Sequence, residues 1–349
     1  MRTHRCPLQT PCRPRPRRLL DHPAGDAVAG TVNVKAGKPN RKTGVSKLTI
    51  TLLVAGQKKV TIKGSTYDGS FTADGQSLAL SLGFSSMTGT FGRYVIDGSR
   101  NVFAAKDAES KMRAAQALNK WRGSYVVAWQ TPGQESRGWN GLSLDVGAKG
   151  VVKAKGSLAD GTAVSAKSQI LVGERECAIA VSWTKKTSSV ACLVWLCEDG
   201  SVECGNLMGG AYALIENART GAFLDSGAAL RLDKDALSAM VPGLMADLLP
   251  DGLAVRMKGT AFDVDKSGKV KLLKDKSGID PAGLGTNPSG LKLKYKMKDA
   301  TFSGSFTAYS LVGGKLKKTR VQVSGVVLGG KGYGTAAIKK IGSSVIQIR

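Results

Sequence analysis

Apolar and polar residues alternate with a period of two over much of this chain. In residues 291–298, apolar side chains occupy every second position and lysines occupy the positions between them. This alternation is typical of a β-strand with one face on a core and the other in solvent. Comparable patterns predict strands at 45–55, 58–66, 151–158, 176–183, 190–197, 253–260, 302–309 and 319–328.

Turn signals separate these strands. Asp-Gly pairs, which tolerate the positive φ angles of tight hairpin turns, occur at 68–69, 74–75, 97–98, 160–161, 199–200 and 251–252. Closely spaced strands joined by short glycine-rich turns favour antiparallel sheets over a parallel sheet with crossover helices. We therefore predict an all-β protein of two or three antiparallel β-sandwich or barrel modules, with one or two short helices at the junctions.

A weak repeat of the form Val-x-apolar-Lys/Ser-Gly indicates modules of about a hundred residues. It occurs at 60–64, 152–156, 255–259 and 321–325. Apolar residues at three- and four-residue spacing behind Asp107 predict a linking helix. A second helix is predicted over 233–249, where Pro242 should divide it. The predicted organisation is a disordered basic tail at 1–26, a β module at 27–105, the linking helix at 106–121, a Trp- and Cys-containing β module at 122–225, and a β module with an N-terminal helical segment at 226–349.

The amino-terminal segment has the composition of a tail rather than a domain. Residues 1–20 hold six arginines, four prolines and no acidic residue. The segment lacks the about 7 to 15 consecutive apolar residues of a secretory signal peptide. A disordered tail is the favoured interpretation; a polybasic contact arm and a fragmentary start are alternatives. No window reaches the roughly 18 apolar residues of a membrane-spanning helix, so we predict no transmembrane segment.

The charged residues narrow the possible chemistry. The chain has 51 Lys and Arg against 26 Asp and Glu, a formal net charge of +25, and its two histidines are His4 and His22. From residue 23 onward, imidazole-dependent catalysis and histidine-ligated zinc are therefore excluded. We predict a non-catalytic protein without catalytic residues or a cofactor. A hydrolase that acts through carboxylates alone is the distant alternative.

Two segments come near to a metal site without completing one. Residues 263–268 open like an EF-hand calcium loop, but Lys274 stands where that loop needs its bidentate glutamate. Four cysteines lie close together in the sequence but lack the two-residue spacing of paired zinc ligands. They are Cys177, Cys192, Cys197 and Cys204. We therefore predict no metal site.

A disulfide is a candidate feature of the same region. If 176–183 and 190–197 form a hairpin that places Cys177 opposite Cys197, then Ile179 faces Trp195 on the same side. Cys192 then points to the other side, because neighbouring residues of a strand alternate in direction. A Cys177–Cys197 bond would form in an oxidising compartment, and two buried thiols are the alternative.

Trp139 is a candidate for ligand contact. It lies in the segment Gly138-Trp-Asn-Gly141, where the flanking glycines indicate a turn. An indole exposed in a turn can stack on a sugar ring, and packing inside the protein is the alternative.

A basic strand face is the second candidate site. Its lysines are Lys292, Lys294, Lys296 and Lys298, with further lysines at 153, 155, 269, 271, 315, 317 and 318. Such a face attracts anionic glycans or cell-surface polymers. The alternative is that these lysines keep a sheet surface solvated and discourage association between sheets. Nucleic-acid binding is disfavoured, because no aromatic residues are interleaved with the basic positions. The oligomeric state is not predicted.

Three long segments carry a resemblance to a protein family. They are KAGKPNRKTGVSKLTITLLVAGQKKVTIKG, WNGLSLDVGAKGVVKAKGSLADGTAVSAKSQILVGE and PSGLKLKYKMKDATFSGSFTAYSLVGGKLKKTRVQVSGVVLGGKGYGTAAIKK. This pattern of strands and turns resembles the carboxy-terminal β-rich modules of large, secreted, multi-module surface proteins of Verrucomicrobia and Lentisphaerae. Such proteins are often described only as repeat-containing. The resemblance implies a secreted or cell-surface location and a structural or adhesive role, with a carbohydrate-binding or anionic-glycan-binding module as the alternative. It supplies no catalytic motif.

Overall fold

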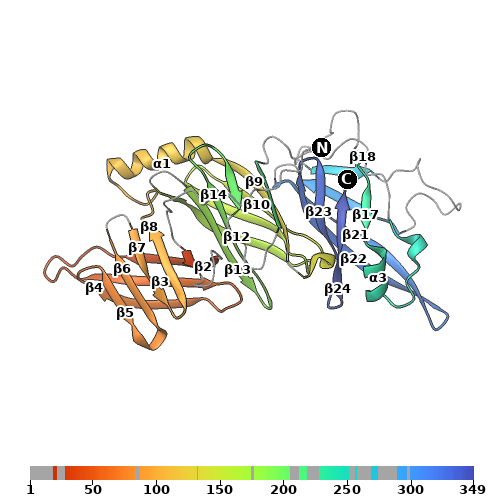
Figure 1. Ribbon diagram of the computed structural model, residues 1–349, viewed down its shortest axis with the longest axis horizontal. Coiled ribbons are helices and arrows are strands. Elements are labelled where there is room, and N and C mark those ends of the chain that lie inside the picture. The colour runs from red at the N-terminus through yellow and green to blue at the C-terminus, as the bar shows by residue number, and fades with distance from the viewer. Residues whose placement is uncertain are drawn as a thin grey trace.

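The computed structural model describes residues 19–21, 28–83, 86–131, 133–173, 177–204, 212–217, 228–250, 256–257, 269–273, 289–296 and 299–349. Within these residues the strands form three antiparallel sheets of eight strands each. We name them the first, central and C-terminal sheets. They lie in a row, with the central sheet between the other two (Figure 1). The predicted all-β class with short helices is confirmed.

The first sheet has the order β4-β3-β2-β1-β8-β7-β6-β5. Its strands are β1 (Leu19–Asp21), β2 (Val28–Ala36), β3 (Ser46–Val54), β4 (Val60–Thr66), β5 (Ser70–Ala73), β6 (Leu78–Leu82), β7 (Ser86–Phe91) and β8 (Tyr94–Ser99), with the 3-10 turn η1 (Asp74–Gln76) before β6. Alternate residues of β3, such as Ile50 and Leu52, are buried in its core. Disorder over all of 1–26 is a wrong prediction, because Leu19–Asp21 finds backbone partners on both β2 and β8. The rest of that tail lies outside the described residues.

Helix α1 (Ala108–Trp121) lies where the linking helix is predicted. The Asp107 side chain accepts a hydrogen bond of 2.8 Å from the backbone N–H of Ser110 and so caps the first turn. Ala117 and Trp121 pack into the core of the central sheet. The same capping bond lowers the pKa of Asp107, since it stabilises the carboxylate form.

The central sheet has the order β15-β14-β13-β12-β11-β10-β9-β16. Its strands are β9 (Gly123–Gln130), β10 (Asn140–Val146), β11 (Val151–Ser157), β12 (Ala163–Val172), β13 (Cys177–Lys185), β14 (Ser188–Leu196), β15 (Val202–Cys204) and β16 (Tyr212–Asn217), with η2 (Glu135–Arg137) before β10. The outer face of β13 and β14 is also buried, because alanine and leucine side chains there pack with Ala55, which directly follows β3 of the first sheet. Two hydrogen bonds join these sheets: Ser182 Oγ donates to the carbonyl of Leu53 at 2.9 Å, and Gly56 N–H donates to Thr184 Oγ1 at 3.1 Å.

The C-terminal sheet has the order β17-β24-β23-β22-β21-β20-β19-β18. Its elements are β17 (Leu230–Leu232), α3 (Lys234–Met240), η3 (Ala246–Leu248), β18 (Arg256–Met257), β19 (Lys269–Leu273), β20 (Lys292–Lys296), β21 (Thr301–Val312), β22 (Lys315–Leu328), β23 (Lys331–Ile338) and β24 (Gly342–Ile348). The Asp233 side chain caps α3 by accepting a 2.9 Å hydrogen bond from Ala236 N–H. The helical region is divided around Pro242, as predicted, because α3 ends before the proline and η3 follows it.

All three sheets share one cyclic order of strands. Strands that follow one another in the chain are neighbours in the sheet, except at one opening in each sheet. The first strand of each sheet also pairs with its last: β1 with β8, β9 with β16, and β17 with β24. What differs is the place where the sheet is open. The opening lies between β4 and β5 in the first sheet, between β15 and β16 in the central sheet, and between β17 and β18 in the C-terminal sheet.

Helices within the described ranges are too short or too polar to span a lipid bilayer.

Candidate functional site

The central and C-terminal sheets meet through their outer faces. Val126 and Ala128 of β9 point away from the central core, because they alternate with core residues of the same strand. They pack against a group of residues from the C-terminal sheet and from the turn before β21, which comprises Ala300, Val326, Leu328, Tyr333 and Val345. We call this contact the junction. A side chain at Gly141 would obstruct it, since a Cβ atom there would lie 2.8 Å from both γ-carbons of Val326.

Trp139 belongs to the junction. Its side chain is only 8% exposed, and its ring meets the Tyr333 ring edge-on with 4.8 Å between the centroids. Its backbone N–H donates to the carbonyl of Gly334 at 3.2 Å. The interpretation of Trp139 as an exposed residue that stacks on a ligand is therefore wrong, because the C-terminal sheet covers it. Local sequence gave no signal for this, since Tyr333 lies far along the chain.

A buried hydroxyl also holds the junction. Thr335 is 0% exposed, and its Oγ1 lies 3.0 Å from the carbonyl oxygen of Arg137 and 2.7 Å from that of Ala159. The hydroxyl has one proton, so it can donate to one carbonyl at a time. Thr335 thus links the C-terminal sheet to two loops of the central sheet.

The cysteine hairpin forms in a different register from the predicted one. Cys177 pairs with Leu196, and Val181 pairs with Cys192. The turn has two residues, with Lys186 at a φ of 57°, and a turn of this length shifts the register by one residue and exchanges the faces. Cys177 and Cys192 therefore share the inner core, while Trp195 lies on the opposite face. The predicted cross-strand pairing of Cys177 with Cys197 is wrong, and no disulfide joins the four cysteines in the part of the chain that is described.

The Cys192 thiol is expected to be inert in the folded protein. Burial raises its pKa to about 12, and only the thiolate reacts rapidly with alkylating reagents. At mildly alkaline pH, iodoacetamide should leave Cys192 unlabelled until the protein is unfolded in urea. Peptide mass spectrometry can measure this, with the half-buried Cys204 as the faster-reacting comparison.

The same burial predicts the direction of a pH effect. The unfolded chain ionises this thiol near its ordinary pKa of 9.0, well below the folded value of about 12. As the pH rises through this window, the unfolded state releases its proton first, so the contribution of Cys192 to the free energy of unfolding decreases. Equal labelling of Cys192 in the folded and unfolded protein would contradict this account.

Strand β20 carries the predicted basic face. Lys292 and Lys294 are exposed and Lys296 is half-buried, whereas Leu293 and Tyr295 between them are buried in the core. Lys298 lies outside the described residues. On the neighbouring strand β21, the register places Ser305 opposite Lys292 and Ser303 opposite Lys294.

A second row of lysines lies on the central sheet. Lys153 and Lys155 of β11 and Lys167 of β12 are exposed. The register places Lys153 directly opposite Lys167. Like charges at directly opposed positions destabilise an antiparallel pair. The pair of Lys153 with Lys167 is therefore unfavourable, while Asp145 lies opposite Lys153 on its other side.

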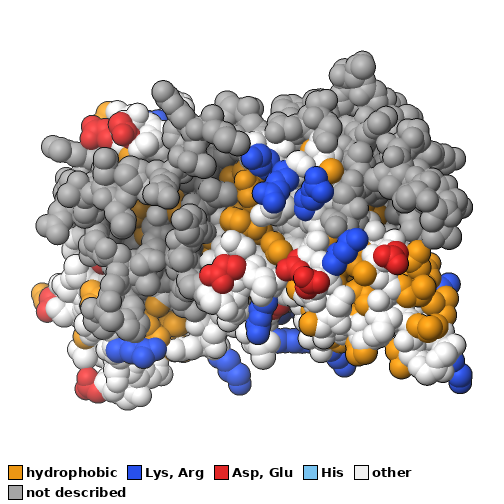
Figure 2. All heavy atoms as spheres, turned by 45° about the vertical axis from the view of Figure 1, so that its right-hand side comes forward, with side chains coloured by type: hydrophobic (Ala, Val, Ile, Leu, Met, Phe, Trp, Pro, Cys, Tyr) orange, Lys and Arg blue, Asp and Glu red, His pale blue; other side chains and the backbone are white. Residues whose placement is uncertain are grey.

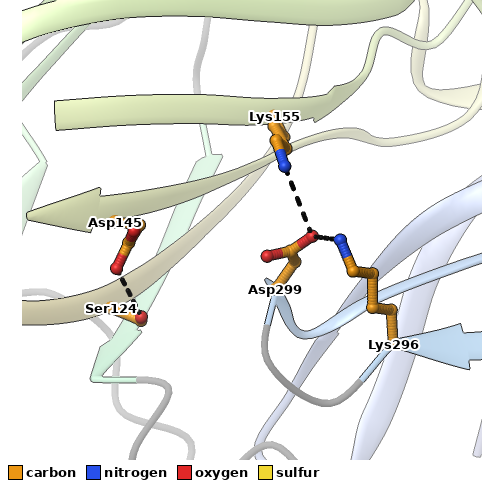
Figure 3. A network of polar contacts seen from close by, with 5 residues as sticks. All are labelled: Ser124, Asp145, Lys155, Lys296 and Asp299. Carbon is orange, nitrogen blue, oxygen red and sulfur yellow. Dashed lines mark hydrogen bonds and ion pairs between the residues drawn. The ribbon is translucent and has the colours of Figure 1, made fainter. Parts of the chain in front are cut away.

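The two rows meet at one carboxylate (Figure 3). Asp299 Oδ2 forms an ion pair with Lys296 Nζ and lies 4.0 Å from Lys155 Nζ. The Asp299 side chain is only 13% exposed, so this contact lies at the edge of the buried junction. Of the two rows, Asp299 contacts Lys155 and Lys296. We name the lysines of both rows the junction lysine face: Lys153, Lys155, Lys167, Lys292, Lys294 and Lys296.

Few acidic side chains offset this charge. Beside the junction lysine face stands Asp145, which is opposite Lys153 in the register and accepts a 3.4 Å hydrogen bond from Ser124 Oγ. Figure 2 shows Lys and Arg side chains near the middle of the molecule, with a few acidic side chains among them. Within the described residues, no cluster of His, Cys, Asp and Glu is arranged to hold a metal ion.

Comparisons of this chain with family models, curated proteins and solved structures gave no match. The resemblance to bacterial surface modules therefore stays a prediction, and the geometry of the junction carries the functional argument.

Proposed function

We propose that this protein is a non-catalytic, adhesive β protein of the cell surface or the extracellular space, and that it binds an anionic glycan through the junction lysine face. The observation that carries the proposal is the meeting of two lysine rows from separate sheets at Asp299. Each row alone is a solvated strand face. Together they form a cationic surface that continues from one sheet to the next, and an extended polyanion can follow such a surface.

The charge arrangement favours a ligand over solvation alone. Lysines on exposed strands keep sheets apart, but alternating signs of charge would do this without the repulsion between Lys153 and Lys167. A bound polyanion would remove that repulsion. The serine hydroxyls opposite Lys292 and Lys294 can also exchange hydrogen bonds with sugar hydroxyls.

The burial of the aromatic side chains favours a glycan over single-stranded nucleic acid as the ligand. Tyr295, which lies between Lys294 and Lys296 on β20, is buried in the core, and Trp139 is buried in the junction. Single-stranded nucleic acids need exposed aromatic side chains on which bases stack. A sulfated or carboxylated polysaccharide needs only cations and hydrogen-bonding groups.

Charge removal on β20 tests the proposal. The double variant Lys292→Gln/Lys294→Gln should bind a sulfated glycosaminoglycan roughly tenfold more weakly at low salt, because fewer counterions are released on binding. Its affinity should also vary less steeply with salt concentration. Both side chains are exposed, so thermal unfolding should be unchanged. Surface plasmon resonance over a salt series gives both quantities.

The matched control removes the same charge elsewhere. Lys47 and Lys63 are exposed on β3 and β4 of the first sheet, and Lys47→Gln/Lys63→Gln should bind like the original protein. Equal weakening by both double variants would show a response to net charge alone. Absence of binding at low salt, or equal affinity for duplex DNA, would refute the assignment to an anionic glycan.

A further inference from the structure

The hairpin of β21 and β22 extends past its neighbouring strands. Strand β20 pairs with β21 only as far as Ser305, and β23 pairs with β22 only from Gln322. Between these points β21 and β22 remain paired with each other up to Val312 and Lys315. We name residues 309–320 the hairpin tip. In Figure 1 this blue hairpin reaches beyond the rest of the C-terminal sheet.

A two-glycine turn closes the hairpin tip. Gly313 and Gly314 have φ angles of 57° and 71°, and a Cβ atom at either position would have no neighbour within 4 Å. Two successive residues with positive φ match the right-handed twist of paired strands, so the turn holds the hairpin in register. The side chains at the end of the hairpin therefore extend into solvent from a regularly paired backbone.

The hairpin tip exposes large apolar side chains. Leu311 is 54% exposed and Leu316 is 55% exposed, and they lie directly opposite each other on one face. Val312, at the turn, is 37% exposed, and Met245 on the adjoining segment is 38% exposed. Met245 N–H donates to the carbonyl of Tyr309 at 2.8 Å, which places this segment against the hairpin. Figure 2 shows hydrophobic side chains gathered on its right-hand side, where the C-terminal sheet lies.

Lys317, Lys318 and Arg320 stand behind the paired leucines, whereas Lys315 lies at the turn, directly opposite Val312. By strand alternation Lys315 and Lys317 lie on one face of β22, and Lys318 and Arg320 lie on the other. Lys318 Nζ is 5.7 Å from the centre of the Tyr309 ring. The sequence from residue 300 to residue 349 contains no acidic residue. On the adjoining segment the exposed carboxylate is that of Asp247.

Protection of a strand edge explains only part of this pattern. Lysines on the unpaired edge of β22 would discourage pairing with another chain. They give no reason for the exposed leucines that lie among them. Apolar side chains at a tip, followed by an aromatic ring and a belt of long basic side chains, match the layers of a bilayer surface, where acyl chains lie beneath anionic headgroups.

We propose that the hairpin tip docks on an anionic lipid bilayer and inserts Leu311, Val312 and Leu316 below the headgroups. Lys317, Lys318 and Arg320 would then lie at headgroup level, and the long side chain of Lys315 would reach back from the turn to the same level. Each basic residue near an anionic surface strengthens binding by about fivefold. This surface differs from the junction lysine face, so either proposal can fail without the other.

Vesicle flotation of the full chain tests the docking. The protein should float with vesicles of phosphatidylcholine containing roughly one third phosphatidylglycerol, and not with pure phosphatidylcholine. Leu311→Ser/Leu316→Ser should weaken this binding about tenfold or more, because the apolar area available for burial is lost. Met112→Ser on α1 is the control, since Met112 is 55% exposed, like Leu316, but lies beside the central sheet.

A tryptophan at the tip reports insertion. The variant Leu316→Trp adds a sixth indole to the five that the chain already has. Its emission should shift to the blue in phosphatidylglycerol vesicles, and brominated lipids should quench it, relative to the original protein. Lys315→Gln/Lys317→Gln should reduce binding by more than tenfold without changing the unfolding midpoint, since both side chains are exposed.

Three results would overturn the proposal. The first is absence of flotation with anionic vesicles at low salt. The second is flotation that the leucine substitutions leave unchanged and that is accompanied by no shift or quenching of Trp emission, because the protein would then be held by charge without insertion. The third is a lipid-independent dimer that Leu311→Ser/Leu316→Ser dissociates in analytical ultracentrifugation, which would show that a second copy covers the tip.

Discussion

Replacing Trp139 by alanine should lower the free energy of unfolding of the junction by about 3 to 5 kcal/mol, the range for removing a large aromatic side chain from a packed site. The indole is 8% exposed and meets the Tyr333 ring across the contact between two sheets. Alanine would leave a cavity there that only a shift of the C-terminal sheet could close. Urea unfolding followed by circular dichroism measures the loss.

Trp139→Phe is the matched control. The indole Nε1 is buried without a hydrogen-bond partner, so removing it relieves a desolvated donor while most of the ring contact is kept. The cost should be within about 1 kcal/mol. Both variants test the assignment of Trp139 to packing: the phenylalanine variant should bind a sulfated glycosaminoglycan like the original protein, and a selective loss of glycan binding would return Trp139 to a ligand site.

Gly334→Ala should destabilise the C-terminal sheet by about 3 kcal/mol, because overpacking a close contact forces backbone and ring to move. A Cβ atom at Gly334 would lie 2.3 Å from the carbonyl oxygen of Ser324 and 2.7 Å from Cζ of Phe302. Phe302 is 1% exposed, and its ring also covers Gly325, which is directly opposite Gly334. To move away, the buried ring would have to displace its neighbours in the core.

The same substitution at an open position separates this clash from a general effect of glycine. A Cβ atom at Gly75 would meet nothing within 4 Å, so Gly75→Ala should leave the unfolding midpoint nearly unchanged. Thermal denaturation of the two variants side by side provides the comparison. Similar midpoints for both would show that the Phe302 ring does not constrain position 334.

Local alternation in the sequence was enough to predict which face of a strand is buried. In β20 it correctly separates Leu293 and Tyr295, which are buried, from Lys292 and Lys294, which are exposed. It succeeds there because one face of that strand packs on a core and the other faces solvent. It fails in β13 and β14, where both faces are buried and a continuous apolar run fits either register.

Features that depend on contacts between sheets could not be predicted from the sequence. The register of the cysteine hairpin depends on whether its loop has two residues or three. A difference of one residue in the loop exchanges the two faces of the strand. The burial of Trp139 and the meeting of Lys155 with Lys296 at Asp299 depend on how two separately formed sheets dock. Nothing in a single segment specifies such a docking.

The pairing of first with last strand in every sheet brings the entry and exit of the chain together at one place in each module. Such a module can act as a cassette, which means that it can be duplicated, removed or inserted in a loop of another protein. The two ends of the host loop would stay close together, because the ends of the module are close together. The three sheets have the same cyclic order of strands but open at different places. They are therefore related to one another in the way that circular permutants of one fold are. The central sheet also shows how a row of cassettes can lengthen, since β13 and β14 face one neighbour while β9 faces the other.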